Sequence, residues 1–519
     1  MFAITSRSNG DATPAVPEGD AVNRIEEFKK EKDGLEIWPE IVRYSGEGPE
    51  AIHERDKALM KWYGVFFRKH TPGFFMMRIR ITNGVATAAQ VRTLAEITGQ
   101  LGAGFADITT RQQVQLRSVR IQDVPAIFRR LRDVGLTSLQ TGMDNVRNVI
   151  GCPVAGLTPR ELLDASPVAR EFTRLFVGKG AYTNLPRKFN VAITGCLENC
   201  VGAESQDIAM VPARKGERVG FNVHVGGKMG SGGYRRADAL DVFVEPARAA
   251  EVAATIVCVY RDHGPREARN RSRFAFLIDD WGVARVRAAV EETFGAPLEP
   301  AGEDARGETR TDHIGIYRQK DGRSYVGLVV PAGRVTAVQL KEVARLAETY
   351  GNGEVRFTTE QNLIIPHVAD PALRELTGEP LLKELPYDPP EILRGLVVCT
   401  GIDFCDLALI DTKARALPMT RSLAAKLADR KEPLRIYWSG CPAGCGNHQL
   451  ADIGFEGTKV RLDGKVVEAV DVWVGGRSGP EARPGQRIME NVPIAELPTV
   501  LEYLARHFPK QPPARTKAA

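Results

Sequence analysis

Four cysteines in the last quarter of the chain have the type and spacing of a metal centre. Cys399 and Cys405 form a C-x5-C pair, and Cys441 with Cys445 forms a C-x3-C pair. Thiolates are the soft ligands that iron–sulfur clusters and zinc prefer. Zinc sites usually space paired ligands at C-x2-4-C, whereas a cluster accepts wider and uneven spacings. The spacing therefore favours a cluster, with zinc as the alternative.

A disulfide framework is a weaker interpretation of these cysteines. The chain has only eight cysteines in 519 residues, and its first residues lack the basic start and apolar core of a secretory leader. No run approaches the 18 apolar residues of a membrane span. We expect a cytoplasmic protein with no membrane partner.

Composition and length indicate a large globular protein. We expect three or four folding units in 519 residues. The 70 basic and 65 acidic residues give a net charge of +5, which is too small to indicate nucleic-acid binding but suits an acidic protein partner. The Pro- and Gly-rich start and the KQPPARTKAA end are expected to be loose tails.

The chain is internally duplicated. The segment that begins at Asn83 matches the segment that begins at Ala332 without gaps at an offset of 249 positions, and both contain a TT pair followed by a glutamine. At almost the same offset, GCLENC matches GCPAGC, and each is followed by Asp-Ile. The chain is therefore two copies of one half, each consisting of a smaller and then a larger unit.

The pattern within each copy predicts an α+β or mixed α/β fold with a pseudo-twofold axis. MMRIRI and YVGLVV are expected strands, each followed by an amphipathic helix and a second strand after the TT pair. The larger units mix strands such as FNVAIT and LRIYWS with helices such as 246–259. A ligand between the two halves would contact side chains from both.

The first copy repeats the cysteine pattern only in part. Cys196 and Cys200 keep the C-x3-C spacing, and Cys152 lies near the position equivalent to Cys399, but the second member of the C-x5-C pair is missing. Cys258 lies in an apolar helical run and is expected in the core. We interpret the three first-copy cysteines as remnants of the duplication or buried thiols, with a second cluster as the alternative.

Basic residues recur at the ends of predicted elements rather than in solvated runs. Arg78 and Arg80 share one face of an otherwise apolar strand. A buried cation requires an anion, and arginine forks match carboxylates with paired hydrogen bonds. A structural ion pair explains any single arginine equally well. Together the basic residues predict a site for a polycarboxylate ligand and a small oxyanion; they are Arg78, Arg111, Arg117, Arg147, Arg187 and Lys188.

The glycine-rich segment VGGKMGSGG fits neither the phosphate-binding nor the dinucleotide-binding motif. No other flavin or nicotinamide motif is visible. If the protein is a redox enzyme, we expect its electrons to come from another protein.

At this point the motifs resemble a known family. CTGIDFC, SGCPAGCGNHQLADIGF, TTRQQVQLR, SLQTGMDNVRN and NLPRKFN, in this order, are similar to the sirohaem and [4Fe–4S] nitrite and sulfite reductases, and most similar to the assimilatory ferredoxin-dependent nitrite reductases. The likeness runs from about Lys61 to Leu504. It reduces the zinc alternative to a minor one.

The resemblance implies the cofactors and their ligands. Cys399, Cys405, Cys441 and Cys445 would hold a [4Fe–4S] cluster, and Cys445 would also bind the sirohaem iron. Arg111, Arg117 and Arg187 would contact the sirohaem carboxylates, with Thr110 and Gln112 as minor contacts. The fold implied is two smaller ferredoxin-like units and two larger units with sirohaem between the halves.

The resemblance also implies the substrate pocket. Arg78, Arg147 and Lys188 would bind the anion and support proton delivery. Sulfite reductases of this family carry a second lysine as K-x-K, whereas this chain has Asn190 there, which suits the monoanion nitrite. A turn or strand-end role for Asn190 is the structural alternative.

The expected domains follow from these segments. They are an N-terminal extension at 1–60, a first small unit at 61–135, a first large unit at 136–305, a second small unit at 310–385, a second large unit at 386–508 and a tail at 509–519.

The resulting hypothesis is a monomeric nitrite reductase that makes ammonium for nitrate assimilation, with reduced ferredoxin or a similar acidic protein as electron donor. Lys29, Lys30 and Lys32 are candidates for donor docking, with a solvated helix face as the alternative. Sulfite reduction on the same scaffold is the second hypothesis, and a related enzyme of corrin synthesis fits less well. A non-catalytic iron–sulfur electron carrier is the hypothesis from another class.

Overall fold

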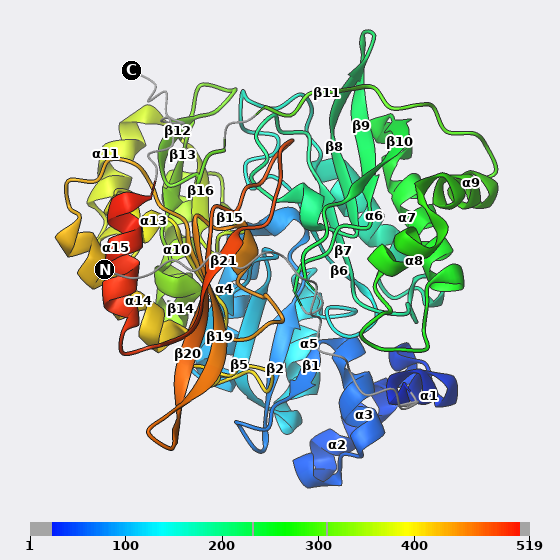
Figure 1. The fold of residues 1–519 in the computed structure, drawn as a ribbon, viewed down its shortest axis with the longest axis horizontal. Helices are drawn as coiled ribbons and strands as arrows, with labels where there is room; N and C mark the ends of the chain where they lie inside the picture. Colours follow the sequence, from blue (N-terminus) through cyan, green and yellow to red (C-terminus); the bar gives the residue numbers. More distant parts are fainter. Residues whose placement is uncertain (1–22, 231–232, 308–309, 509–519) are drawn as a thin grey trace.

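The computed structural model describes residues 23–230, 233–307 and 310–508 (Figure 1). The predicted tails at the start of the chain and at 509–519 lie outside the described residues. No helix in the described part is long and apolar enough to cross a membrane.

Two five-stranded sheets form the small units, and they exchange a strand. The first sheet has the order β1-β2-β5-β4-β14 and the second has β12-β13-β16-β15-β3. β14 (Arg334–Thr336) belongs to the second copy but pairs with β4 (Phe105–Ile108), and β3 (Val85–Thr87) pairs in the same way with β15 (Glu354–Phe357). The other strands are β1 (Val65–Phe67), β2 (Phe74–Ile79), β5 (Val114–Arg120), β12 (Gly315–Arg318), β13 (Ser324–Leu328) and β16 (Leu363–Val368).

Each small unit carries the predicted helix. α4 (Ala88–Leu101) begins at a capping box in which the Thr87 side chain accepts from the Gln90 amide and the Gln90 side chain accepts from the Thr87 amide. α10 (Ala337–Tyr350) begins at the same box built from Thr336 and Gln339. Apolar residues of both helices and both sheets belong to one hydrophobic core. The strand exchange and the shared core make the two small units one structural body, whereas the sequence predicted two separate units.

Two larger sheets complete the pseudo-symmetric pair. The first has the order β10-β9-β8-β7-β6 with β11 beside β8, and the second has β17-β18-β19-β20-β21. In each, the first three strands along the chain are parallel and the rest are antiparallel. The first-sheet strands are β6 (Val146–Ile150), β7 (Phe189–Ile193), β8 (Ile208–Lys215), β9 (Arg218–Val225), β10 (Asp238–Val244) and β11 (Glu303–Asp304). The second-sheet strands are β17 (Leu396–Val398), β18 (Ile436–Ser439), β19 (Ile453–Leu462), β20 (Lys465–Val474) and β21 (Gln486–Pro493).

Helices cover these large sheets on the outside of the molecule (Figure 1). The predicted helix at 246–259 is confirmed as α7 (Pro246–His263), whose apolar face lies in the core of the first large unit. Its neighbours are α6 (Ser166–Phe176), α8 (Phe274–Trp281) and α9 (Val283–Phe294). The second large unit has α14 (Lys413–Lys426) and α15 (Leu497–His507). The remaining helices of the two copies are α5 (Val124–Asp133), α11 (Asp370–Gly378), α12 (Leu381–Glu384) and α13 (Glu391–Arg394).

The described part of the predicted N-terminal extension is helical and packs on the first small unit. It contains α1 (Arg24–Glu31), α2 (Trp38–Glu47) and α3 (Glu54–Leu59), and apolar residues of α2 join the core of the small units. Lys29 is buried and forms ion pairs with Glu26 and Asp144. Its assignment to a docking face, or to a solvated helix face, is therefore wrong.

Candidate active site

Two parallel strands bring the four predicted cluster ligands to one edge of the second large sheet. Cys399 directly follows β17 and Cys441 follows β18 by two residues. These strands pair in parallel, with Val398 opposite Trp438, so their carboxyl ends lie at the same sheet edge. The residues of both strands are buried, and they are mostly apolar, although β17 is the edge strand of the sheet and only β18 is an inner strand. Both cysteine loops therefore leave the sheet side by side.

The thiols of this quartet act on one another electrostatically. Burial and the charges of Cys445 and Cys405 raise the pKa of the Cys399 thiol to about 11. Burial together with the other three sulfurs raises the pKa of Cys441 to about 12. No hydrogen bond joins two thiols of the quartet among the described contacts. Four sulfur side chains that act on one another from two adjacent loops fit a cationic iron–sulfur core that would take the place of their protons.

Cys445 differs from the other three because its side chain is exposed. Its backbone carbonyl accepts a hydrogen bond from the Thr110 hydroxyl of the first copy at 3.1 Å. The thiol thus lies where the two copies meet. An exposed thiol beside three more buried ones fits the predicted role of a ligand shared with a second group.

Arg78 and Arg147 lie together on the first copy. Arg78, on β2, donates to the Thr141 carbonyl at 3.0 Å and lies over the Phe66 ring. Arg147, on β6, donates to the same carbonyl at 2.8 Å and to that of Met143 at 2.9 Å. Neither guanidinium has a carboxylate partner among the described residues. Arg80, by contrast, is a structural residue that donates to four backbone carbonyls.

Repulsion among these cations lowers their pKa values. Burial and the charges of Arg111 and Arg68 lower the pKa of Arg78 to about 9, and the Cys445 thiolate opposes that change. Burial, Arg78 and Arg111 lower the pKa of Arg147 well below its usual value. The site therefore concentrates positive charge. Cys445, Asp144 and Asp207 offset part of it, but none of them forms an ion pair with Arg78 or Arg147 among the described residues.

Lys188 and Arg111 belong to the same cluster of cations. Burial and the charges of Arg273 and Arg111 lower the pKa of Lys188, and Cys445 raises it. Burial also lowers the pKa of Arg111, again against Cys445. The Lys188 ammonium has no hydrogen-bond or ion-pair partner in the described part of the chain. We call Arg78, Arg111, Arg147 and Lys188 the cation cluster.

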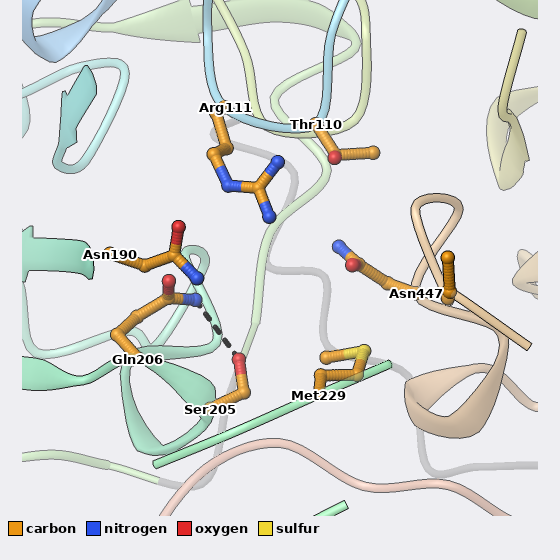
Figure 2. A pocket seen from close by; sticks show the side chains of 9 residues that line it. Thr110, Arg111, Asn190, Ser205, Gln206, Met229 and Asn447 are labelled. Carbon is orange, nitrogen blue, oxygen red and sulfur yellow. Dashed lines mark hydrogen bonds between the residues drawn. The ribbon is translucent and has the colours of Figure 1, made fainter. Parts of the chain in front are cut away.

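A polar pocket lies beside Cys445, and Figure 2 shows its lining. Arg111 and Thr110 enter it from one loop, and the Arg111 guanidinium extends into its middle. Asn190 and Gln206 lie on one side and Asn447 on the other. The buried Asn190 side-chain oxygen has no hydrogen-bond partner among the described residues. Asn190 is the second residue of β7, as the strand-end alternative expects, and its side-chain oxygen is also a free acceptor beside a cation.

Three other predicted residues have protein partners in the structure. Arg117 is buried and forms an ion pair with Asp107 at 2.7 Å, and it also donates to Gln115 and Thr400. Arg187 lies 3.9 Å from Asp144. The Gln112 side-chain amide is occupied by backbone groups. It donates to the carbonyls of Gly151 and Phe357, and its oxygen accepts from the Gly151 N–H. We leave Gln112 out of the cofactor contacts proposed below.

Sequence reasoning missed the pair that holds Asn190. The backbone N–H of Asn190 donates to the Asp207 carboxylate at 2.8 Å, and the Arg273 guanidinium donates to the same carboxylate at 2.8 and 3.2 Å. The signal was present, since Asp207 has the duplicate Asp452, which accepts from the Arg435 amide at 2.9 Å. Arg273 has no such duplicated counterpart that would have indicated its role from the sequence.

The arrangement can hold a large polyanion against Cys445. The cation cluster comes from the first copy and the thiol from the second, so a ligand between them contacts both halves. Repelling cations around an exposed thiolate fit a carboxylate-rich macrocycle whose metal binds sulfur. Donors that remain free after such binding suit a small oxyanion.

Comparisons with known proteins agree with this chemistry. The family model described as the nitrite and sulphite reductase 4Fe-4S domain matches residues 142–298 and 391–517. The model described as the nitrite/sulfite reductase ferredoxin-like half domain matches residues 67–134 and 317–381. Each model matches twice, which confirms the duplication predicted from the sequence.

Relatives match along almost the whole chain. A protein named ferredoxin–nitrite reductase from Leptolyngbya laminosa is 43% identical and covers 96% of this chain and 100% of its own. An assimilatory ferredoxin-dependent nitrite reductase from Haloferax mediterranei is 41% identical, covering 94% and 89%. The solved structure of the Mycobacterium tuberculosis NirA protein is 32% identical, with a TM-score of 0.89 over 95% of each chain.

Proposed function

The chain belongs to the nitrite and sulphite reductase family, and on this premise we propose that it reduces nitrite to ammonium. The reaction consumes one nitrite, six electrons and eight protons, and it yields one ammonium and two waters. Reduced ferredoxin, or an acidic carrier like it, is the electron donor, as the names of the two relatives state for those proteins. The observation that carries the proposal is that Arg78, Arg111 and Lys188 lie close enough to Cys445 to interact with it electrostatically. Arg147 lies beside Arg78, since both donate to the Thr141 carbonyl.

Two cofactors are part of this proposal. Cys399, Cys405, Cys441 and Cys445 would hold a [4Fe–4S] cluster, and Cys445 would also bind the iron of a sirohaem. When bound, these groups supply single-electron transfer and a metal position for the substrate. Arg111 is the best-placed carboxylate contact, since its guanidinium extends into the pocket beside Cys445 (Figure 2). Arg117 and Arg187 remain predicted contacts, although each already has a carboxylate partner.

Arg147, Arg78 and Lys188 bind the anion in this proposal. The Arg78 and Arg147 guanidinium groups, both held by the Thr141 carbonyl, orient the nitrite oxygens without reorganising during the reaction. The Lys188 Nζ holds a proton that it can donate to a departing oxygen and recover through water. The lowered pKa of Lys188 makes that donation easier.

Asn190 is proposed to favour nitrite over sulfite. A lysine at this position would add a cation that suits a dianion, whereas the neutral amide leaves the charge of the pocket lower. Its free side-chain oxygen can accept a hydrogen bond from a protonated substrate atom or from a water.

We also propose a monomeric enzyme in the cytoplasm. One chain supplies both halves of the site, so no second copy is needed to complete it. All eight cysteines are free thiols, which suits a reducing compartment. Light scattering on the purified enzyme measures the mass of the particle against the 56.9 kDa of one chain.

The test is substrate-dependent oxidation of a reduced viologen dye by the purified protein. Nitrite and sulfite are compared at equal concentration, with ammonium and sulfide quantified. Faster oxidation with nitrite and ammonium as product supports the proposal. Faster oxidation with sulfite would assign the same scaffold to sulfite reduction. A protein that contains the cluster but turns over neither anion would be an electron carrier.

A further inference from the structure

A second group of metal-binding side chains lies in the first copy, away from the cation cluster. Ligand atoms of Glu198, Cys200 and His313 lie within 4.8 Å of one another, and all three residues are buried. The His313 Nε2 atom is 3.2 Å from the Cys200 sulfur. Glu198 and Cys200 follow β7, whereas His313 comes from the second copy, just before β12. No sequence motif places His313 beside these cysteines.

A fourth side chain adjoins this triad. The Cys196 thiol contacts the Cys200 thiol by a hydrogen bond and also accepts from the Glu198 amide at 3.4 Å. Cys196 and Cys200 have the C-x3-C spacing that falls within the habit of zinc sites. Two thiols, an imidazole and a carboxylate are the donor types of a tetrahedral zinc site.

Neighbouring residues hold the ligands in place. The other His313 ring nitrogen, Nδ1, lies 3.0 Å from the Tyr325 hydroxyl, so Nε2 is the atom presented to Cys200. One Glu198 oxygen accepts from Arg160 at 2.6 Å and from the Thr311 hydroxyl at 2.8 Å. These contacts use only Oε1 and leave Oε2 for a ligand role. Outer contacts of this kind are typical of metal ligands.

The backbone at His313 is also unusual. Its φ of 59° is left-handed, a conformation that costs energy in a residue other than glycine. A side chain at position 327 would put Cβ 1.6 Å from the His313 carbonyl oxygen, so Gly327 makes room for this conformation. The left-handed backbone of His313 and the absence of a side chain at Gly327 together let His313 reach the cysteines.

The packing of the thiols argues against a second cluster. Cys196 hydrogen-bonds both Cys152 and Cys200, so the three thiols are in contact. The corners of a cubane lie too far apart for its ligands to touch in this way, and no hydrogen bond joins two thiols of the Cys399 quartet among the described contacts. Contacting thiols suit ligands of one ion.

We propose that Cys196, Glu198, Cys200 and His313 bind one zinc ion, which ties the loop after β7 to the second copy. The site is structural, since all four ligands come from the protein and are buried. It does not depend on the substrate of the enzyme. Cys152 contacts Cys196 but lies outside the ligand set.

The test begins with metal analysis of the purified enzyme with its cofactors. We expect about one zinc per chain in addition to the iron of the cofactors. X-ray absorption at the zinc edge should give two sulfur and two nitrogen or oxygen neighbours, with zinc–sulfur distances of about 2.3 Å. Absence of zinc from enzyme produced in zinc-supplemented medium, or an additional iron–sulfur signal instead, would overturn the proposal.

Two variants and a matched control locate the site. Cys200→Ser and His313→Gln should each lower the zinc content at least about tenfold, while the absorbance of the cofactors is unchanged. Cys152→Ser removes a thiol that touches Cys196, and it should retain zinc. Equal zinc content in all three variants would place the ion elsewhere and reject the assignment. If a variant does not fold, the absorption spectrum of the unmodified enzyme still decides the ligand set.

Discussion

Arg147 and Arg394 occupy equivalent positions in the two copies, five residues before Cys152 and five before Cys399, but their surroundings are opposite. Arg394 forms a paired ion contact with Asp312 at 2.7 and 2.8 Å, and its pKa is raised despite burial. Arg147 has only carbonyl partners, and its pKa is lowered. One arginine is neutralised inside the protein, whereas the other remains available to an external anion.

The same contrast extends along the two loops that face each other across the pseudo-twofold axis. Arg111 corresponds to Glu360, which forms an ion pair with Arg310, and Asn190 corresponds to Arg435, which binds Asp452. Arg310, Glu360 and Tyr437 line a second pocket beside Cys200. Thus the second copy keeps its charges internally paired, and the cation cluster exists only on the first. The cysteines show the reverse, since the complete quartet exists only on the second.

These differences show that only one of two symmetry-related half-sites combines unpaired cations with the complete cysteine quartet among the described residues. A pseudo-symmetric pair of copies would form two sites, each with cations from one copy and thiols from the other. Thr110 and Thr359 are consistent with this, because each hydroxyl donates to the backbone carbonyl of the second cysteine of the C-x3-C pair in the opposite copy, at 3.1 and 3.2 Å. In the second half-site Glu360 and Arg435 form ion pairs, and His313 lies beside Cys200.

The largest expected effect comes from replacing the second cysteine of each C-x3-C pair, Cys445 and Cys200, with serine. Cys445→Ser should lose both the sirohaem and the cluster absorbance, and activity with them, because the shared ligand is removed. Cys200→Ser should retain both chromophores. Absorbance spectra and iron content of the two purified variants measure the difference. Cys258→Ser, in helix α7, is the control for cysteine removal in general. Loss of cofactors from Cys200→Ser would refute the asymmetry.

Asp107→Asn should weaken the junction between the copies. Burial raises the pKa of Asp107, but Lys413, Arg117 and Arg334 outweigh it and lower that pKa well below 3.8. The neutral amide leaves these cations unbalanced, and we expect a loss of about 3–5 kcal/mol in the free energy of unfolding at neutral pH. Urea unfolding followed by circular dichroism measures this loss.

The pH dependence of that loss has a definite sign. A carboxylate whose pKa is lower in the folded state stabilises the protein above its unfolded pKa, and this contribution falls as the solution becomes acidic. The difference between the unmodified protein and Asp107→Asn should therefore narrow between about pH 5 and about pH 3. A difference that stays constant over this range would show that Asp107 acts through packing instead.

Arg147→Ala and Arg394→Ala separate the anion site from its structural counterpart. Arg147→Ala should retain both chromophores and lower kcat about 10²–10³-fold, because donors to the reacting anion are lost. Arg394→Ala should keep its turnover per sirohaem but lose about 1–3 kcal/mol of stability, because Asp312 loses its paired donor. Normal turnover in Arg147→Ala would remove this residue from the proposed site.

The duplication was predictable from the sequence alone. The candidate cluster ligands and cations could also be named there, because each depends on residue type and local spacing, and their roles stay predictions. The capping boxes at Thr87 and Thr336 and the parallel strands before the cysteines are equally local signals. The strand exchange was not predictable, since β3 and β14 are three-residue strands whose partners lie in the other copy. Lys29 was misplaced because its partner Asp144 is distant in sequence. His313 was missed for the same reason, as its contact with Cys200 spans 113 positions.

Asn190→Lys would make the first copy still more cationic and sharpen the contrast at positions 190 and 435. We expect the ratio of sulfite to nitrite turnover to rise at least about tenfold, which corresponds to about 1.4 kcal/mol, since the added charge favours the dianion. The viologen assay with both anions gives this ratio. Asn190→Met is the neutral control and should leave it unchanged. An unchanged ratio in Asn190→Lys would exclude the position as a determinant of substrate choice.

The smallest effect is expected from the paired threonines. Thr110→Val removes one hydrogen bond to the Cys445 carbonyl, and Thr359→Val removes its equivalent at Cys200. Each bond is worth about 0.5–1.5 kcal/mol. Because only the Cys445 loop holds the cofactors, Thr110→Val should speed sirohaem loss in dilute urea severalfold, whereas Thr359→Val should not. The rate of absorbance loss measures this directly. Equal rates in the two variants would mean that both loops support the cofactors, and the two half-sites would then be less different than their charges indicate.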